Sequence, residues 1–320
     1  MHANKRGTIS DYPYFNPSND AENIKNSLRE HSKKVDCVIN ILCKRSNLQR
    51  QRIRDAYRRL YGSDLLEDLK RAFDEDFRNF VIAIMTPKYE FEAKELYNAI
   101  DGFGTTEETL TEILCSSTND EINNIKRAYS TLYKKELEND VGGDTSDAYK
   151  KLLINILRIP RANCSDVNQS FAQEDARKLY KEGEGRWGTD DQLFATVFAT
   201  RSYCQLLNIF EEYQKSTNST IEQAIDNEFS SDSRSAFHAI IDVARSTPDY
   251  FVKLLDKYLT DSGKKYKKYI QRIIVSRSEI DLKDIVETYR SNTGSNLGER
   301  IKNKFSNDVG DGLSALINGN

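Results

Sequence analysis

Two glycine-rich stretches decide how this chain folds and what it binds: Gly102-Phe-Gly-Thr105 and Gly183-Glu-Gly-Arg-Trp-Gly-Thr189. Each precedes a segment with helical periodicity. Each is followed by an acid forty positions after its last glycine, Asp144 (144 − 104 = 40) and Glu228 (228 − 188 = 40). Glycine permits positive φ and lets backbone carbonyls turn outward. Calcium takes about six to eight oxygen ligands from carbonyls, carboxylates and water. The pattern of loop carbonyls plus one distant carboxylate therefore predicts a partial oxygen cage, and it occurs twice.

The rest of the chain repeats around these stretches. One set of equivalent positions holds tyrosine in all four copies, and a second set, eight residues later, holds an aliphatic residue. The intervals between tyrosines are 72, 84 and 76 residues (129 − 57, 213 − 129 and 289 − 213). The members are Tyr57, Tyr129, Tyr213 and Tyr289, followed by Leu65, Leu137, Ile221 and Leu297. Both sets are interpreted as packing positions between helices.

The repeats predict an all-α chain with about five short helices in each copy. Apolar residues recur three and four positions apart, and no alternating run is long enough to require a strand. The expected divisions are a tail at 1–19, repeats at 20–86, 90–159, 173–245 and 249–318, and an inter-half linker at 160–172, where Pro160 and two asparagines interrupt the pattern.

Composition narrows the functional classes. Of the 320 residues, 38% are hydrophobic and 30% charged, with 15 Gly and 5 Pro, which suits amphipathic helices joined by short loops. A net charge of −3 gives no overall attraction to nucleic acid, so no nucleic-acid partner is expected. No apolar run approaches the roughly 18 residues of a membrane span. The N-terminus has no apolar signal core. Five cysteines without metal-ligand spacing are interpreted mostly as buried thiols of a reducing compartment.

With these features the sequence resembles an annexin over nearly its whole length, from about Asp20 to Leu316. The segments that carry the resemblance are Gly102-Phe-Gly-Thr with Gly143-Asp-Thr-Ser, Arg186-Trp-Gly-Thr-Asp with Glu228, Thr200-Arg-Ser, Val275-Ser-Arg-Ser-Glu-Ile-Asp-Leu282 and the tail segment Gly7-Thr-Ile-Ser-Asp-Tyr-Pro. The resemblance implies a slightly curved all-α disc of four right-handed helical repeats, with calcium loops on its convex face. It also implies reversible binding to acidic phospholipid, with phosphatidylserine-like headgroups, when calcium rises.

The resemblance assigns calcium ligands in two repeats only. In repeat 2 they are the carbonyls of Ile100, Gly102 and Gly104 with the Asp144 carboxylate. In repeat 3 they are the carbonyls of Gly183, Arg186 and Gly188 with the Glu228 carboxylate. The acid position holds Ala72 in repeat 1 and Lys304 in repeat 4. Without a carboxylate the largest Coulomb attraction is lost, so these two sites are expected not to bind calcium.

Capping chemistry points to the same two loops. Thr105 with Glu108, and Thr189 with Gln192, have the spacing of a capping box, which would fix each loop against the start of a helix. The matching positions in repeats 1 and 4 are Lys33 and Lys265, which cannot cap in this way.

Side chains near the loops are candidates for membrane contact. Phe103 and Trp187 lie between ligand positions, and aromatic rings favour the membrane interface, so both are expected at the loop tips. Lysines in the loops of repeats 1 and 4 are candidates for calcium-independent contact with acidic lipid or sulfated glycans. These are Lys33, Lys34, Lys264, Lys265, Lys267, Lys268 and Lys304. A solvated loop without function is the alternative interpretation.

Other functional classes have less support. No nucleophile, histidine pair or nucleotide-binding loop indicates an enzyme. A scaffold that self-associates in membrane-bound arrays, or an extracellular adhesion or glycan-binding protein, is the alternative to a calcium-dependent membrane binder. The expected location is the cytoplasm, peripheral at membranes when calcium is raised, and the resemblance leaves unconventional secretion open.

Overall fold

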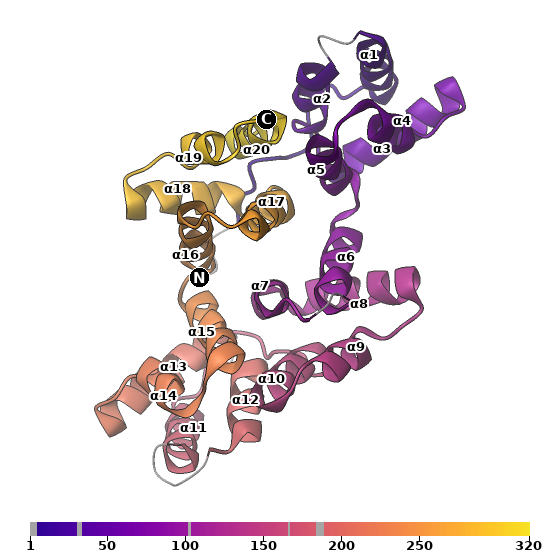
Figure 1. Cartoon of the computed structure of the whole chain (residues 1–320). Coiled ribbons are helices and arrows are strands. Elements are labelled where there is room, and N and C mark those ends of the chain that lie inside the picture. The colour runs from indigo at the N-terminus through magenta and orange to yellow at the C-terminus, as the bar shows by residue number, and fades with distance from the viewer. Residues whose placement is uncertain (1–4, 31–33, 102–103, 166, 184–188) are drawn as a thin grey trace. The chain divides into compact units, whose positions relative to one another are not determined.

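The computed structural model describes residues 5–30, 34–101, 104–165, 167–183 and 189–320. Within these ranges the chain forms twenty helices and no strand, five helices for each of the four repeats (Figure 1). The prediction of an all-α repeat architecture is therefore confirmed. The helices group into two compact units, and the division falls within α6 and α16.

Unit 1 combines the two ends of the chain, Met1–Phe91 and Phe251–Asn320. Repeat 1 supplies α1 (Pro17–Arg29), α2 (Lys34–Leu42), α3 (Asn47–Tyr61), α4 (Leu65–Ala72) and α5 (Glu75–Met85). Repeat 4 supplies α16 (Thr247–Thr260), α17 (Lys264–Arg277), α18 (Leu282–Thr293), α19 (Leu297–Lys304) and α20 (Asp308–Asn318). The first and last repeats pack together because α5 contacts α17 and α20, and α2 contacts α20.

Unit 2 is the continuous stretch Glu92–Tyr250. Repeat 2 supplies α6 (Lys88–Ile100), α7 (Glu107–Ser116), α8 (Asn119–Tyr133), α9 (Leu137–Asp144) and α10 (Asp147–Arg158). Repeat 3 supplies α11 (Gln169–Glu182), α12 (Asp191–Thr200), α13 (Tyr203–Thr217), α14 (Ile221–Glu228) and α15 (Ser231–Arg245). Contacts of α10 with α12 and of α7 with α15 join the two repeats. The linker at 160–172 thus lies inside unit 2 and does not separate the two units.

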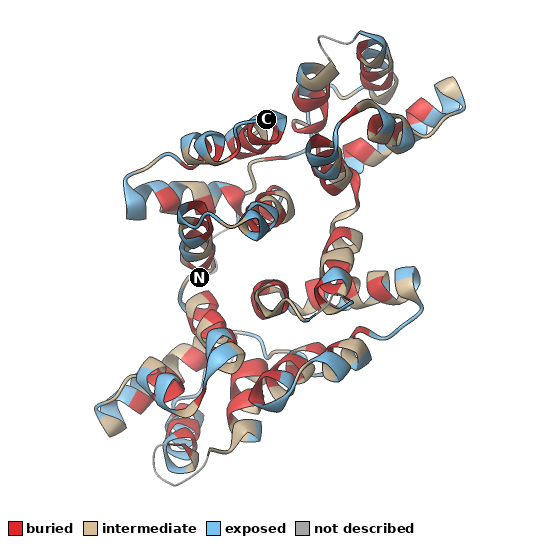
Figure 2. Cartoon of the chain, in the orientation of Figure 1, coloured by how far each residue is buried: buried red, intermediate tan, exposed pale blue. Residues whose placement is uncertain are grey.

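Buried residues occur along the helices of every repeat (Figure 2), and the repeated tyrosines and aliphatic residues are among them, as the sequence predicts. All four tyrosines have no exposed surface, and the aliphatic residues begin α4, α9, α14 and α19. The hydroxyl groups of Tyr57 and Tyr129 donate hydrogen bonds to Asp68 and Asp140, each at 2.7 Å. A buried tyrosine needs such a partner, because an unsatisfied hydroxyl inside the protein is costly.

The tail crosses from repeat 4 to repeat 1 within unit 1. The backbone N–H groups of Thr8 and Ile9 donate to the carbonyl oxygen of Ser278 at 2.8 and 3.0 Å. Gly7 lies so close to Glu279 that an added Cβ would sit 2.7 Å from its backbone carbon. At the other end of the chain, the Asn320 amide donates to the carbonyl oxygen of Ser10 at 2.7 Å. The tail therefore belongs to the packed structure of unit 1.

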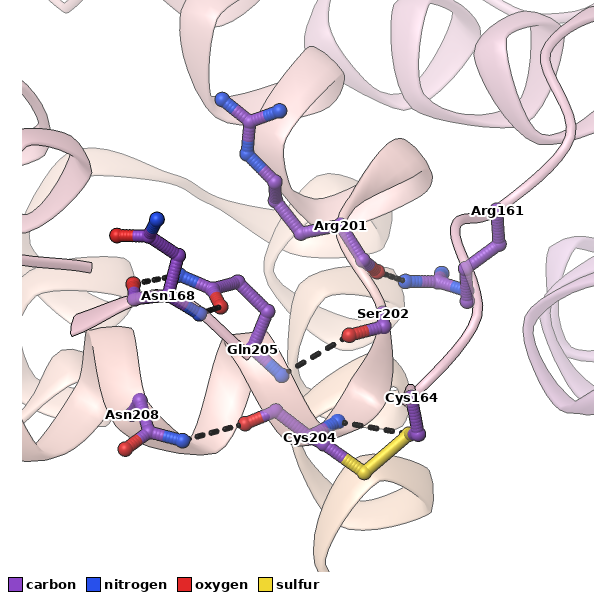
Figure 3. Close-up of a disulfide and its surroundings, with 8 residues drawn as sticks. All are labelled: Arg161, Cys164, Asn168, Arg201, Ser202, Cys204, Gln205 and Asn208. Carbon is purple, nitrogen blue, oxygen red and sulfur yellow. Dashed lines mark hydrogen bonds between the residues drawn. A yellow bond between two sulfur atoms is a disulfide. The ribbon is translucent and has the colours of Figure 1, made fainter. Parts of the chain in front are cut away.

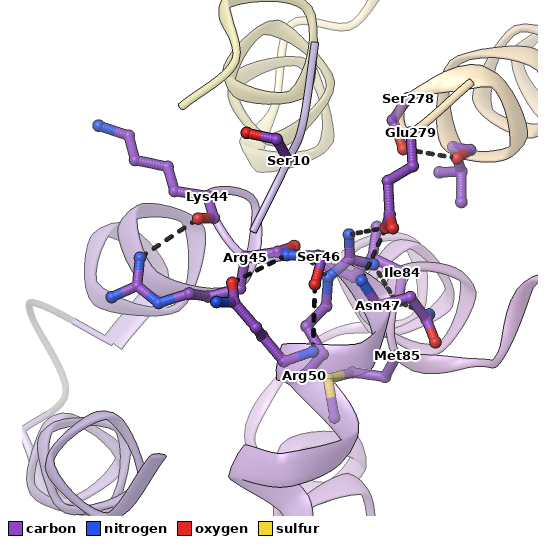
Figure 4. Close-up of polar contacts among 12 residues, drawn as sticks. Ser10, Lys44, Arg45, Ser46, Asn47, Arg50, Ile84, Met85, Ser278 and Glu279 are labelled. Atoms are coloured by element: carbon purple, nitrogen blue, oxygen red, sulfur yellow. Dashed lines mark hydrogen bonds and ion pairs between the residues drawn. The ribbon is translucent and has the colours of Figure 1, made fainter. Parts of the chain in front are cut away.

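A buried arginine joins the same two repeats beneath the tail (Figure 4). The Arg50 guanidinium pairs with Glu279 at 3.2 Å, and the backbone N–H of Asn47 donates to the same carboxylate oxygen at 2.7 Å. Burial lowers the pKa of Arg50, while the Glu279 charge acts in the opposite direction. A buried charge is tolerated where it is paired and hydrogen-bonded, and here that pair connects α3 to the segment between α17 and α18.

The prediction that most of the cysteines are buried thiols is wrong, because two of the five form a disulfide and Cys37 is only half-buried. Cys164 and Cys204 form a disulfide across 40 residues of sequence, with Cα atoms 5.4 Å apart (Figure 3). The linker passes beside the start of α13, where the Arg161 guanidinium donates to the Arg201 carbonyl oxygen at 2.6 Å, and this path brings the thiols together. Disulfides are typical of oxidising environments, so the cysteines do not indicate a reducing compartment.

The remaining three cysteines are free thiols, of which Cys43 and Cys115 are buried as predicted. Burial raises the pKa of both thiols to about 12, which makes them unreactive at neutral pH. None of the helices in the described ranges is both long enough and apolar enough to span a bilayer.

Candidate calcium loops of repeats 2 and 3

The loop of repeat 2 connects α6 to α7. Ile100 is the last residue of α6, and the loop closes where the N–H of Thr106 donates to the carbonyl oxygen of Ala99 at 2.9 Å. Gly104 has φ of 94°, a left-handed conformation that side chains rarely adopt. The predicted ligand Gly102 and the predicted membrane contact Phe103 lie outside the described residues.

The acid of repeat 2 reaches this loop from α9. Asp144 is the last residue of α9, and the Thr105 hydroxyl donates to its carboxylate at 2.5 Å. The same hydroxyl lies 3.2 Å from the Asp144 carbonyl oxygen. The two ends of the forty-residue spacing therefore meet, and the carboxylate is held beside the loop that contains Gly104.

Repeat 3 has the same arrangement between α11 and α12. The N–H of Asp190 donates to the carbonyl oxygen of Glu182 at 3.0 Å, which closes the loop. The Thr189 hydroxyl donates to the carboxylate of Glu228, the last residue of α14. Gly183 follows α11, and an added Cβ there would lie 3.0 Å from the Leu179 carbonyl oxygen. The other predicted ligands, Arg186 and Gly188, and the predicted membrane contact Trp187, lie outside the described residues.

The predicted capping boxes are wrong. The cap of α7 is Thr106, which makes no side-chain cap bond, and the cap of α12 is Asp190, whose carboxylate accepts from the N–H groups of Gln192 and Leu193. Each helix starts one residue later than the capping box requires. Thr105 and Thr189 each lie one residue before the actual cap, and their hydroxyls donate charge-assisted hydrogen bonds to the acids. The threonines therefore tie each loop to its acid.

The sequence did not predict a negatively charged pocket that lies where the α9–α10 and α14–α15 connections meet the starts of α7 and α12. Its volume is about 300 Å³, and both predicted ligand acids line it together with four further carboxylates. The six are Glu107, Asp144, Asp147, Asp191, Glu228 and Asp232. Burial raises the pKa of Glu107, and the charges of Asp232, Glu108 and Asp144 add to that rise. A bound cation would relieve this repulsion. Glu107 and Asp191 occupy equivalent positions in repeats 2 and 3, and so do Asp144 and Glu228. This repetition of acids in the sequence is the signal that could have revealed the pocket.

The donor set fits a hard cation held partly by backbone oxygens. Within the described ranges, no three side chains of His, Cys, Asp or Glu lie close enough together to bind a metal by themselves. Asp144 and Glu228 each offer two carboxylate oxygens beside a loop that Gly104 or Gly183 allows to turn tightly. Such oxygen donors suit Ca²⁺, which accepts carbonyl and carboxylate ligands in flexible geometry.

The corresponding positions of repeats 1 and 4 lack the acid and hold lysines close by. The Lys34 ammonium donates to the Ala72 carbonyl oxygen at 2.6 Å, and the Lys304 ammonium donates to the carbonyl oxygens of Asp261 and Leu259. The lysines at the start of α17 are exposed, namely Lys264, Lys265, Lys267 and Lys268. Lys33 lies outside the described residues.

Comparison with known proteins gives the family. The family model described as "Annexin" matches residues 19–84, 91–156, 174–240 and 250–316. Annexin A5 of Bos taurus is 36% identical over 314 residues, which is 98% of each chain. Annexin A6 of Mus musculus is 37% identical over 314 residues, and the chain spans about half of that protein's length, 46%.

Solved structures agree with this match. Annexin III superimposes with a TM-score of 0.94 at 37% identity, covering 99% of this chain and 98% of that one. A calcium-bound annexin (Sm)1 superimposes with a TM-score of 0.85 at 29% identity, covering 98% and 93%. With four matched repeats that span most of its residues, the chain belongs to the annexin family.

Proposed function

We propose that this protein binds acidic phospholipid membranes reversibly through calcium ions held in the loops of repeats 2 and 3. The family as a whole supports calcium-dependent phospholipid binding. The observation that carries the assignment to these repeats is the position of Asp144 and Glu228, each bonded to the threonine of its loop. Ala72 and Lys304 at the equivalent positions cannot supply this ligand.

The chemistry follows from the number of ligands the chain supplies. In repeat 2 these would be the carbonyls of Ile100, Gly102 and Gly104 with the Asp144 carboxylate, and in repeat 3 the carbonyls of Gly183, Arg186 and Gly188 with Glu228. Since calcium takes about six to eight oxygens, positions remain for water or for a lipid phosphate oxygen. The lipid then completes the coordination of an ion that the loop only partly surrounds, so removing calcium releases the membrane. Trp187 and Phe103 are proposed to enter the interface beside these ions.

Vesicle sedimentation tests the proposal. Vesicles containing phosphatidylserine should pellet the protein in calcium and release it in chelator, with a shift in the emission of Trp187, the single tryptophan. The double variant Asp144→Ala, Glu228→Ala should lose at least ten-fold in the calcium sensitivity of binding. Unchanged calcium dependence in that variant would refute the assignment. An unshifted emission spectrum despite binding would refute insertion of Trp187 alone.

A matched control separates ligand loss from loss of charge. Glu136→Ala with Glu211→Ala removes the same charge from repeats 2 and 3, and both side chains are exposed. This control should bind vesicles with the calcium dependence of the unaltered protein. Assembly of the protein in calcium without vesicles would instead favour a self-associating scaffold.

The exposed lysines of α17 support a second candidate, contact with anionic surfaces without calcium. Four of the first five residues of this helix are lysines, and all four are exposed. Each lysine near an anionic surface adds about 1 kcal/mol of attraction, which salt weakens. Pelleting that persists in chelator at low salt and disappears at high salt would support this candidate, and heparin in place of vesicles would test sulfated glycans. No pelleting in chelator at low salt would exclude it.

A further inference from the structure

The loop of repeat 4 contains a fixed cation from the protein itself. Lys304 is the last residue of α19 and occupies the position of Asp144 and Glu228 in the other unit. Its ammonium donates to the carbonyl oxygen of Asp261 and, at 3.2 Å, to that of Leu259. These carbonyls belong to the end of α16 and the loop that leads to α17. A positive group therefore connects the two segments that an acid and a calcium ion would connect in repeats 2 and 3.

Repeat 1 makes the same connection from the opposite side. Lys34 is the first residue of α2, and its ammonium donates at 2.6 Å to the carbonyl oxygen of Ala72, the last residue of α4. The ammonium also lies 5.4 Å from the centre of the Phe73 ring, where a cation is attracted to the aromatic face. In repeat 4, Lys304 stands at the position of the calcium-binding acid and bonds to the loop. In repeat 1, Lys34 stands just after the loop and bonds to Ala72, which occupies the position of the acid. What the two repeats share is the charge and its place.

We propose that Lys304 acts as a built-in cation that holds the loop of repeat 4 closed without calcium, and that Lys34 in the same way ties the start of α2 to the end of α4. An ammonium group satisfies several carbonyl oxygens at once, because it carries three donors. Being covalently attached, it is present at any calcium concentration, and its charge opposes entry of a second cation. Repeat 4 would then differ in kind from repeats 2 and 3: calcium orders the loops of those two repeats, and a lysine orders the loop of repeat 4.

The surroundings of Lys304 agree with this role. The Asp261 carboxylate accepts from the N–H of Gly263 at 3.2 Å, and this bond, with a smaller contribution from the Lys304 charge, lowers the pKa of Asp261. Lys304 itself is only partly exposed, whereas its neighbour Lys302 is exposed and pairs with Asp311 at 3.3 Å. Lys304 therefore bonds to the backbone of the loop, whereas Lys302 bonds to a side chain of α20.

Amide hydrogen exchange of the full-length protein, with and without calcium, tests the proposal. In the unaltered protein, exchange over residues 255–268 should be the same in calcium and in chelator. Lys304→Met, which keeps the length of the side chain and removes the charge, should speed exchange there at least ten-fold. Lys304→Arg should retain most of the protection, and Lys302→Met should behave as the unaltered protein.

Repeat 1 supplies an independent arm of the same experiment. Lys34→Met should speed exchange over residues 68–76 and leave residues 255–268 unchanged. Unchanged exchange over α20, which belongs to the same unit as both lysines, would show that unit 1 of each variant is folded. Wild-type protection over 255–268 in the Lys304→Met variant, or protection in the unaltered protein that requires calcium, would overturn the proposal. Failure of the loops of repeats 2 and 3 to respond to calcium would refute the proposed function and leave this result standing.

Discussion

Asp64 joins two helices of repeat 1 through one carboxylate. It caps α4 by accepting from the N–H of Leu66 at 2.9 Å, and it pairs with Arg54 of α3 at 2.9 Å and with Arg58. Burial alone would raise its pKa, but the hydrogen bonds from the two arginines outweigh this and lower the pKa of Asp64 to about 2. Since its ordinary value is 3.8, the stabilisation is complete above pH 4 and is lost as the pH falls toward 2.

Replacing Asp64 by asparagine isolates the charge, because asparagine caps helices about as well as aspartate. Asp64→Asn should lower the free energy of unfolding at pH 7 by roughly 1–2 kcal/mol, and the difference should shrink toward zero near pH 2. Urea denaturation of both proteins at several pH values measures this difference in the free energy of unfolding. The control Glu67→Gln, in the exposed pair with Lys70, should change little. A difference for Asp64→Asn that does not vary with pH would contradict the explanation.

At the scale of single residues, the sequence predicts which residues form the site better than it predicts the hydrogen bonds that they make. The forty-residue spacing predicts which acid faces which loop, and the structure places Asp144 beside Thr105 and Glu228 beside Thr189. The role of the two threonines could not be predicted, because it depends on where each helix begins, and Thr106 and Asp190 are the actual caps. The Cys164–Cys204 disulfide was missed for a similar reason, since nothing in the sequence shows where the linker passes α13.

At the scale of elements, α20 packs on α5 at a glycine. A Cβ added at Gly312 would lie 2.4 Å from the ring of Phe80, which has no exposed surface. Gly312→Ala should therefore lower the free energy of unfolding by about 1–3 kcal/mol. Urea denaturation at pH 7 measures the change.

A second glycine provides the opposite case. Gly143 lies in α9 with nothing within 4 Å of an added Cβ. Gly143→Ala should stabilise the protein by up to about 1 kcal/mol, because alanine restricts the unfolded chain and favours the helix. If Gly312→Ala proves neutral, the close approach of α20 to α5 is not a tight contact.

The helices themselves follow from the sequence, because apolar periodicity and the repeated tyrosines place five helices in each repeat. Their pairing does not. Whether repeat 1 packs against repeat 2 or repeat 4 depends on contacts such as that of α5 with α20, between segments far apart in the chain. The negatively charged pocket was missed for the same reason, since its acids come from two repeats and converge only when α7 packs on α15.

For the molecule as a whole, the disulfide makes a prediction about one unit. Cys164 and Cys204 both lie in unit 2, and the cross-link encloses 40 residues of sequence. Reduction, or Cys204→Ser, should lower the free energy of unfolding of unit 2 by about 2–4 kcal/mol, because the unfolded chain regains the freedom of that loop. Trp187 falls within the residue range of unit 2, so its emission during urea denaturation follows this unit.

Hydrogen exchange in α20 reports on unit 1 in the same samples and should be unchanged. Thiol counting verifies the reduction, since the free thiols should rise from three to five. An unshifted tryptophan transition after complete reduction would show that the disulfide does not stabilise unit 2.

The division of the chain into a continuous and a split unit affects how the protein folds during its synthesis on the ribosome. Helices α1–α5 are made before unit 2, but their partners α17 and α20 are made only after it. The 159 intervening residues (250 − 92 + 1) take roughly 10–30 s to translate, and during that time the apolar faces of repeat 1 lack their partner. Repeats 2 and 3 meet no such delay, so the middle of the protein can finish folding while its beginning still needs shelter from aggregation, for example by a chaperone.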